Sequence, residues 1–136
     1  MAHIQPPSPL QAKKLAQFVP ASLVSKFCQG VHQFNCGEYF ESHETLELVW
    51  REQEGAEREL TQGIIQIAVA CHHLERNNKM GALKLFKRGL ARVRKFETRD
   101  TGLCLTELCS QVQNLISADL ADKAADNFSH PALRFA

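Results

Sequence analysis

The chain has 136 residues, of which 44% are hydrophobic and 23% charged, and its formal net charge is +1. This composition is typical of one globular domain, large enough for a single core and too small for two. The low net charge creates no overall field that would attract nucleic acid or an anionic membrane. No apolar run approaches the roughly 20 residues of a membrane-spanning helix, and residues 1–9 lack the regions of a signal peptide. We therefore expect a cytoplasmic protein.

The five cysteines form no recognisable framework. Their number is odd, and no two are spaced as C-x-x-C; they are Cys28, Cys36, Cys71, Cys104 and Cys109. A disulfide scaffold or a zinc knuckle is therefore not expected. Cys28, Cys71 and Cys109 fall on apolar helical stripes, so we expect them to act as small core hydrophobes.

Three regions follow one another along the chain. Four of the five prolines lie in residues 1–21, which we expect to form a Pro-rich N-terminal arm. Apolar residues then recur at helical spacing over residues 22–117, which predicts a helical domain. Residues 118–136 carry few signals and are expected to be a C-terminal tail. Because no strand pattern appears, the predicted fold class is all-α, a single compact bundle of about five helices.

The predicted helices occupy residues 22–34, 37–51, 57–76, 79–96 and 105–117. Gly37 supplies a left-handed cap between the first two, which should therefore pack as an antiparallel hairpin. The third helix is apolar nearly all round, and this pattern predicts a buried central helix. Gly81 and Gly89 weaken the fourth helix relative to alanine, which suggests that its backbone closely approaches a neighbour at these positions.

The second predicted helix carries polar residues where a plain amphipathic helix would not. At roughly 100° per residue, Tyr39, His43, Leu46 and Trp50 share one side, and Glu47 lies beside them. If this arc faces the core, a histidine and a carboxylate are buried. Burying even an uncharged polar group without a partner costs roughly 2–7 kcal/mol. We therefore expect a partner, which could be a metal ion, a ligand or another side chain.

Three motifs occur in order across about half of the chain. They are Phe34-x-x-Gly37-x-Tyr39-Phe40-Glu41-x-His43-Glu44-x-Leu46-Glu47-x-x-Trp50, Gln62-Gly63-x-Ile65-Gln66-x-Ala68-x-Ala70 and Asn78-x-x-Gly81-Ala82-x-x-Leu85. Together they resemble the family called domain of unknown function 309, small helical proteins found mainly in bacteria and archaea. The resemblance implies an all-helical fold with the His-Glu and Gln-Gln segments on adjacent helices. It implies no established activity.

A small-ligand pocket between the second and third helices is one hypothesis. Its candidate ligand-binding residues are His43, Glu44, Glu47, Trp50, Gln62 and Gln66. His43 would act as a donor or acid–base group and Glu47 as the carboxylate that orients it. These two are also the candidate catalytic residues, and they would act through an activated water molecule. No nucleophile is evident, because Ser42 is expected to face away and the cysteines look structural.

A metal site is the second hypothesis. His43 and Glu47 are one helical turn apart, which lets two side chains reach one ion. His73 is the third candidate ligand. Such an oxygen-rich site would suit a divalent ion such as Mn, Fe or Mg and would support metal-assisted hydrolysis. The Glu-x-x-His pattern of ferritin-like di-iron proteins is absent, because no histidine has an acidic residue three positions before it.

The third hypothesis is a structural or interaction module without catalysis. The histidine, glutamate and glutamine side chains could simply bond to one another and fix the register of two helices. A symmetric homodimer would suit a small helical domain. The fourth helix is basic on its outer side, but no aromatic residues alternate with the cations as in single-strand binders, so nucleic acid is not the expected partner. The sequence leaves these alternatives open.

Overall fold

The computed structural model describes residues 7–118 and 130–136. Its helices are α1 (Pro9–Leu15), the 3-10 helix η1 (Ala21–Leu23), α2 (Val24–Asn35), α3 (Tyr39–Glu52), α4 (Arg58–Glu75), α5 (Lys79–Arg94) and α6 (Leu105–Ser117). The all-α class is confirmed. The described part contains six α-helices rather than about five, because α1 forms within the Pro-rich segment. Ser8 and Gln11 form a capping box at its N-terminus, and Pro9 lies in its first turn. A capping box and a proline in the first turn both favour the start of a helix.

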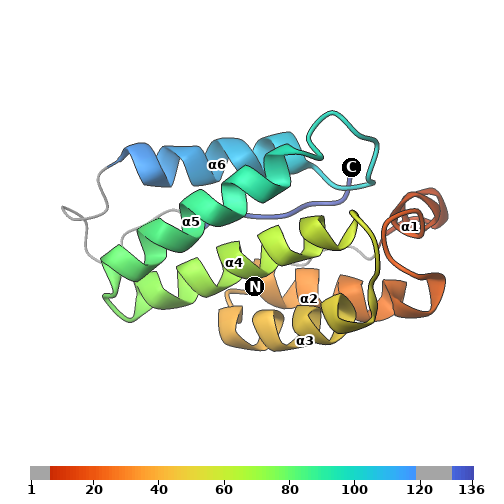
Figure 1. Cartoon of the computed structure of the whole chain (residues 1–136), viewed down its shortest axis with the longest axis horizontal. Helices are drawn as coiled ribbons and strands as arrows, with labels where there is room; N and C mark the ends of the chain where they lie inside the picture. The colour runs from red at the N-terminus through yellow and green to blue at the C-terminus, as the bar shows by residue number, and fades with distance from the viewer. Residues whose placement is uncertain (1–6, 119–129) are drawn as a thin grey trace.

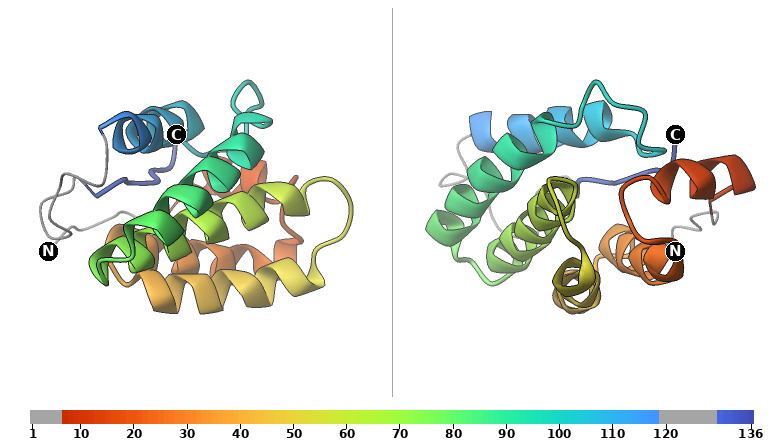
Figure 2. Two further views of the ribbon diagram at one scale, coloured as in Figure 1. Left: turned by 60° about the vertical axis from the view of Figure 1, so that its left-hand side comes forward. Right: turned by 45° about the vertical axis from the view of Figure 1, so that its right-hand side comes forward.

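The helices pack in the order of the chain, as Figures 1 and 2 show. α2 packs against α3, α3 against α4, α4 against α5 and α5 against α6. The predicted α2–α3 hairpin is confirmed, and Gly37 turns the chain between them with φ of 80°. The left-handed conformation suits glycine because it has no Cβ. In this arrangement α3 and α5 lie on either side of α4.

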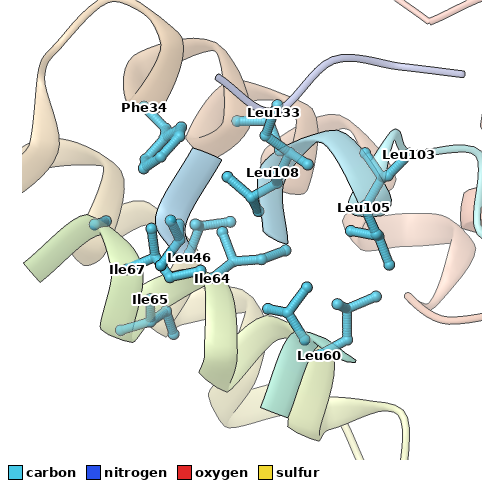
Figure 3. Close-up of a cluster of buried hydrophobic side chains, with 14 of the residues drawn as sticks. Phe34, Leu46, Leu60, Ile64, Ile65, Ile67, Leu103, Leu105, Leu108 and Leu133 are labelled. Atoms are coloured by element: carbon cyan, nitrogen blue, oxygen red, sulfur yellow. The ribbon is translucent and has the colours of Figure 1, made fainter. Parts of the chain in front are cut away.

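Helix α4 is the buried central helix that the apolar pattern predicts. Ten of its 18 residues are buried, more than in any other described helix. Figure 3 shows Ile64 and Ile67 of α4 beside Leu46 of α3, with Leu108 of α6 and Leu133 of the C-terminal segment in the same cluster. The core thus joins α3, α4 and α6 with the end of the chain.

Helices α4 and α5 approach closely where two glycines meet. A Cβ added to Gly89 would lie 2.8 Å from the carbonyl oxygen of Gly63, so the expected close approach at Gly89 is confirmed. The same expectation is wrong for Gly81. A Cβ there would meet the side chain of Asn78 at 2.5 Å, and Asn78 caps α5 by accepting a hydrogen bond from the Gly81 amide.

Both ends of the described chain contribute to the same core. Leu15, Phe18 and Val19 are buried in it, and so is Leu133. Residues 130–136 run back along α6 and end beside α1 (Figure 1). Part of the predicted tail, residues 119–129, lies outside the described residues. No helix in the described ranges is long and apolar enough to cross a membrane.

Candidate functional site

Helix α3 is rotated relative to the expected orientation. Its buried residues are Tyr39, Ser42, Thr45, Leu46 and Val49. The expectation that Ser42 faces away is therefore wrong: its hydroxyl donates a 2.7 Å hydrogen bond to the carbonyl oxygen of Gly30 on α2. A Cβ at Gly30 would lie 2.6 Å from the Leu46 side chain. Small residues let α2 and α3 approach, and this contact sets the rotation of α3.

As a result, His43 and Glu47 lie at the edge of the core and not within it. Their side chains are 27% and 37% exposed, and Nε2 of His43 lies 3.1 Å from Oε2 of Glu47. The other oxygen of Glu47 lies 3.4 Å from the guanidinium of Arg51. The partner that the sequence required for this histidine is thus present on the same helix, one turn away.

These two side chains line a groove over α4. It has a volume of about 370 Å³ and is lined by His43, Glu47, Trp50, Gln62, Ile65, Gln66, Val69 and Leu85. Helix α4 contributes four of these residues, α3 contributes three, and α5 contributes Leu85. Helices α3 and α5 flank α4 and leave its glutamine-bearing side partly exposed, so this side forms the floor of the groove.

The structure therefore brings together most of the predicted ligand-binding residues. The predicted site did not include the apolar members Ile65, Val69 and Leu85. Ile65 and Val69 each lie three residues from one of the two glutamines, so helical spacing places them beside Gln62 and Gln66. Leu85 could be found only from the packing of α5 on α4.

An ion-pair cluster supports the α5 side of the floor. The guanidinium Nε of Arg92 donates a 3.1 Å hydrogen bond to Oε1 of Gln66. A second nitrogen of Arg92 pairs with Glu59, which also accepts from Lys95 at 3.3 Å. The hydrogen bond from Lys95, with help from Arg92, lowers the pKa of the Glu59 carboxyl below its usual value. The Gln66 amide is therefore held in place from the α5 side.

Trp50 forms the end of the groove near the α3–α4 turn. It is partly buried and packs against the core, so it is less buried than the fully enclosed Tyr39. The guanidinium of Arg58 lies over its ring, 3.9 Å from the centroid, and donates to the Trp50 carbonyl oxygen at 3.3 Å. The cation–π contact and the hydrogen bond join Trp50 to Arg58 of α4 at this end of the groove.

Two predicted site residues lie outside the groove. Glu44 is exposed on α3 and does not line it. His73 lies in the last turn of α4, where its ring nitrogen is 3.3 Å from the amide nitrogen of Asn78. Among residues 7–118 and 130–136, no three or more histidine, cysteine or acidic side chains are grouped to hold a metal ion.

The cysteines are all free thiols. Cys71 and Cys109 are buried and Cys28 is partly buried, while Cys36 is exposed. Burial raises the pKa of Cys71 and raises that of Cys109 to about 12, with a further contribution from Glu97 at Cys109. These two thiols therefore stay protonated at neutral pH, which agrees with a role as core hydrophobes.

Fold and groove together define a small helical-bundle protein with a polar groove over its central helix. Residues 27–85 match the model of a family described as Domain of unknown function (DUF309). This match confirms the resemblance drawn from the three motifs. All residues that line the groove fall within the matched segment. A search of curated proteins found no match.

Proposed function

We propose that the groove over α4 binds a small polar ligand. The observation that carries this proposal is the lining itself: polar side chains from α3 and α4 and the indole of Trp50 border one hollow of about 370 Å³. Ligand pockets in proteins are usually about 300–1,000 Å³, mostly apolar, with a few converging polar groups. The groove fits the lower end of that range.

The lining favours a flat ligand that carries hydrogen-bond donors and acceptors side by side. The amides of Gln62 and Gln66 can each donate and accept. The Gln66 oxygen already accepts from Arg92, so its amide nitrogen is the group left to bind a ligand. Ile65, Val69 and Trp50 would contact the apolar faces of the molecule. A carboxamide or a nitrogen heterocycle has both properties.

His43 and Glu47 would give this ligand site its chemistry. With Nε2 of His43 directed at Glu47, the carboxylate orients the ring and leaves Nδ1 as the second nitrogen. A histidine oriented by a carboxylate is suited to accept a proton from a water molecule. If the site is catalytic, we propose hydrolysis by activated water with His43 as general base and Glu47 as its positioning residue.

A divalent cation is the second candidate ligand. The 3.1 Å separation of Nε2 and Oε2 is short enough for both atoms to coordinate one ion at about 2.0–2.2 Å. Water or a substrate would supply the remaining positions, since His73 lies at the far end of α4. Such a site would support metal-assisted hydrolysis.

Fluorescence of Trp50 provides a direct test, because Trp50 is the only tryptophan in the chain. We would titrate the protein with nicotinamide, adenine and cytosine as flat probes, and with Mn²⁺ and Mg²⁺ as ions. Binding in the groove should change the emission in a saturable way for the wild type. Gln62→Leu and His43→Ala should weaken the response at least tenfold, because each removes a polar group from the lining.

Glu44→Gln provides the matched control. Glu44 is on the same helix and exposed, but outside the groove, so this variant should respond as the wild type does. A response to the ions alone, lost in His43→Ala and Glu47→Gln, would favour the metal site. If no probe or ion produces a response and Glu47→Gln keeps full thermal stability, the cluster is a structural network and the ligand proposal is wrong.

A further inference from the structure

The C-terminal segment, residues 130–136, is bound to the helical body in the way that a peptide is bound by a receptor. Its centre is Leu133, which is completely buried and lies beside Leu108 and near Phe34 in Figure 3. The backbone of Leu133 is held by one side chain of α2. The amide nitrogen of Asn35 donates to the Leu133 carbonyl oxygen, and the Asn35 oxygen accepts from the Leu133 amide, both at 2.8 Å.

Further contacts extend this clamp along the segment. Gln111 of α6 accepts from the backbone amide of Ala132 at 2.8 Å. The backbone amide of Cys104 donates to the Arg134 carbonyl oxygen at 2.8 Å. The guanidinium of Arg134 forms a two-pronged pair with Glu107, at 3.0 and 2.6 Å. Main-chain bonds, a leucine pocket and a charge pair therefore act together.

This combination is the general pattern of extended-peptide recognition. Main-chain hydrogen bonds supply affinity for any extended segment, and side-chain pockets supply specificity. Here Asn35 and Gln111 read the backbone, while the leucine pocket and Glu107 read the side chains. These groups belong to α2, α6 or the turn that precedes α6. At the two ends of the segment, Tyr39 of α3 stacks on His130, and the Gln11 side chain of α1 donates to the Ala136 carbonyl oxygen. None of these contacts requires that the bound segment come from the same molecule.

We propose that the docking site formed by Asn35 of α2 and by Glu107 and Gln111 of α6 is a peptide-binding site that residues 130–136 of a second copy of the chain can fill. The segment itself supplies the argument for this occupant, because its leucine and arginine match the pocket and Glu107. Exchange of an identical segment between two molecules creates a dimer without any new type of contact. The intramolecular segment competes at an effective concentration of about millimolar. Exchange should therefore become detectable when the docking of residues 130–136 on their own chain is weakened.

The first experiment uses the full-length Leu133→Asp chain as host, because an aspartate cannot occupy the leucine pocket. The probe is a synthetic peptide of residues 130–136, His-Pro-Ala-Leu-Arg-Phe-Ala, with a fluorophore at its N-terminus. Fluorescence anisotropy should show saturable binding. The same peptide with the Leu133→Asp change should not bind, and a host with both Leu133→Asp and Asn35→Ala should bind at least tenfold more weakly.

The second experiment tests the second copy as occupant. The Leu133→Asp chain keeps an intact docking site with Asn35, and the Asn35→Ala chain keeps an intact C-terminal segment with Leu133. Mixed at high concentration, they should form a heterodimer in sedimentation velocity that neither forms alone. Peptide binding without this heterodimer would overturn the assignment to a second copy.

Circular dichroism establishes whether the Leu133→Asp chain keeps its helices. If it does not, Arg134→Glu replaces it as host in both experiments. The Arg134 side chain is 65% exposed and pairs with Glu107, so this change weakens docking without disturbing the core. If the peptide binds neither host at millimolar concentration, the docking site on α2 and α6 is not a peptide-binding site and the proposal fails.

Discussion

The two long sides of α4 differ in how they are covered. On the α5 side, Gly63 and Gly89 bring two helix backbones into contact, so no space remains. On the side between α3 and α5, Gln62 and Gln66 are partly exposed and form the floor of the groove. Helix α4 is therefore closely packed on one side, which we call the sealed side, and partly open to solvent on the other. The polar residues of an otherwise apolar helix mark the open side.

The largest expected effect comes from truncating an isoleucine on the sealed side. Ile67 is completely buried, so Ile67→Ala should lower the free energy of unfolding by about 2–5 kcal/mol, through lost transfer energy and a cavity. Val69, two residues along, lines the groove and is half-buried. Val69→Ala should lower it by only about 1 kcal/mol. Urea denaturation of both variants measures the difference, and equal losses would show that the groove side is packed as tightly as the core.

The next effect concerns the glycine contact. Replacing glycine by alanine inside a helix normally stabilises it, by roughly 0.5–1 kcal/mol. Gly89→Ala should do the opposite and destabilise the fold by about 1–3 kcal/mol, because its Cβ would lie 2.8 Å from the Gly63 carbonyl oxygen. Thermal and urea unfolding give the sign. A stabilised Gly89→Ala variant would mean that α4 and α5 can move apart at no energetic cost. The close packing of the two helices at Gly63 and Gly89 would then not contribute to stability.

Helical periodicity predicted most of the fold. The apolar stripes located the helices, and the almost uniform apolar character of α4 identified the central helix. Helix α1 was not counted among the predicted helices of the bundle, because the prolines around it indicated an N-terminal arm, although its capping box was present in Ser8 and Gln11. The docking of residues 130–136 was not predictable, since it depends on Asn35 being placed opposite Leu133.

The groove was predicted only in outline. The sequence grouped His43 and Glu47 with Gln62 and Gln66, and the structure places all four on one groove. It misjudged how α3 is rotated, because hydrophobicity ranks Ser42 below its aromatic neighbours. In the structure Ser42 is small enough to face Gly30 and bonds to its backbone. Rotation was thus decided by size and one hydrogen bond, which periodicity does not represent.

A neighbouring pair of residues on α3 tests this rotation. Ser42→Ala removes a buried donor from the Gly30 carbonyl and should destabilise the fold by about 0.5–1.5 kcal/mol. His43→Ala removes a partly exposed pair with Glu47 and should change stability by less than about 1 kcal/mol, while weakening ligand binding in the groove at least tenfold. Urea unfolding and Trp50 fluorescence separate the two effects. A larger stability loss for His43→Ala than for Ser42→Ala would contradict the observed orientation of α3.

The smallest expected effect is the dependence of stability on pH at the edge of the floor. The pKa of the Glu59 carboxyl is lowered from its usual 4.5, first by the hydrogen bond from Lys95 and then by Arg92. A carboxyl whose pKa is lower in the folded chain stabilises it above the unfolded value, and this stabilisation is lost as pH falls through the folded pKa. The melting temperature of Glu59→Gln should therefore lie below that of the wild type at pH 7, and the two should converge on acidification below about pH 4. High salt should narrow the difference at pH 7, because the side chains of Glu59, Arg92 and Lys95 are 32%, 37% and 61% exposed and salt screens their attraction.

Glu54→Gln is the control for this measurement, since Glu54 is exposed and forms no ion pair within residues 7–118 and 130–136. Its melting temperature should follow that of the wild type at every pH.

Because Arg92 bonds to both Glu59 and Gln66, Glu59→Gln should also loosen the Gln66 amide on the groove floor. At pH 7, Glu59→Gln should then bind the probe more weakly than the wild type does. This difference in binding should disappear below about pH 4, as the difference in melting temperature does. Unchanged binding would show that Gln66 is held without the ion pairs, and that the two sides of α4 act independently.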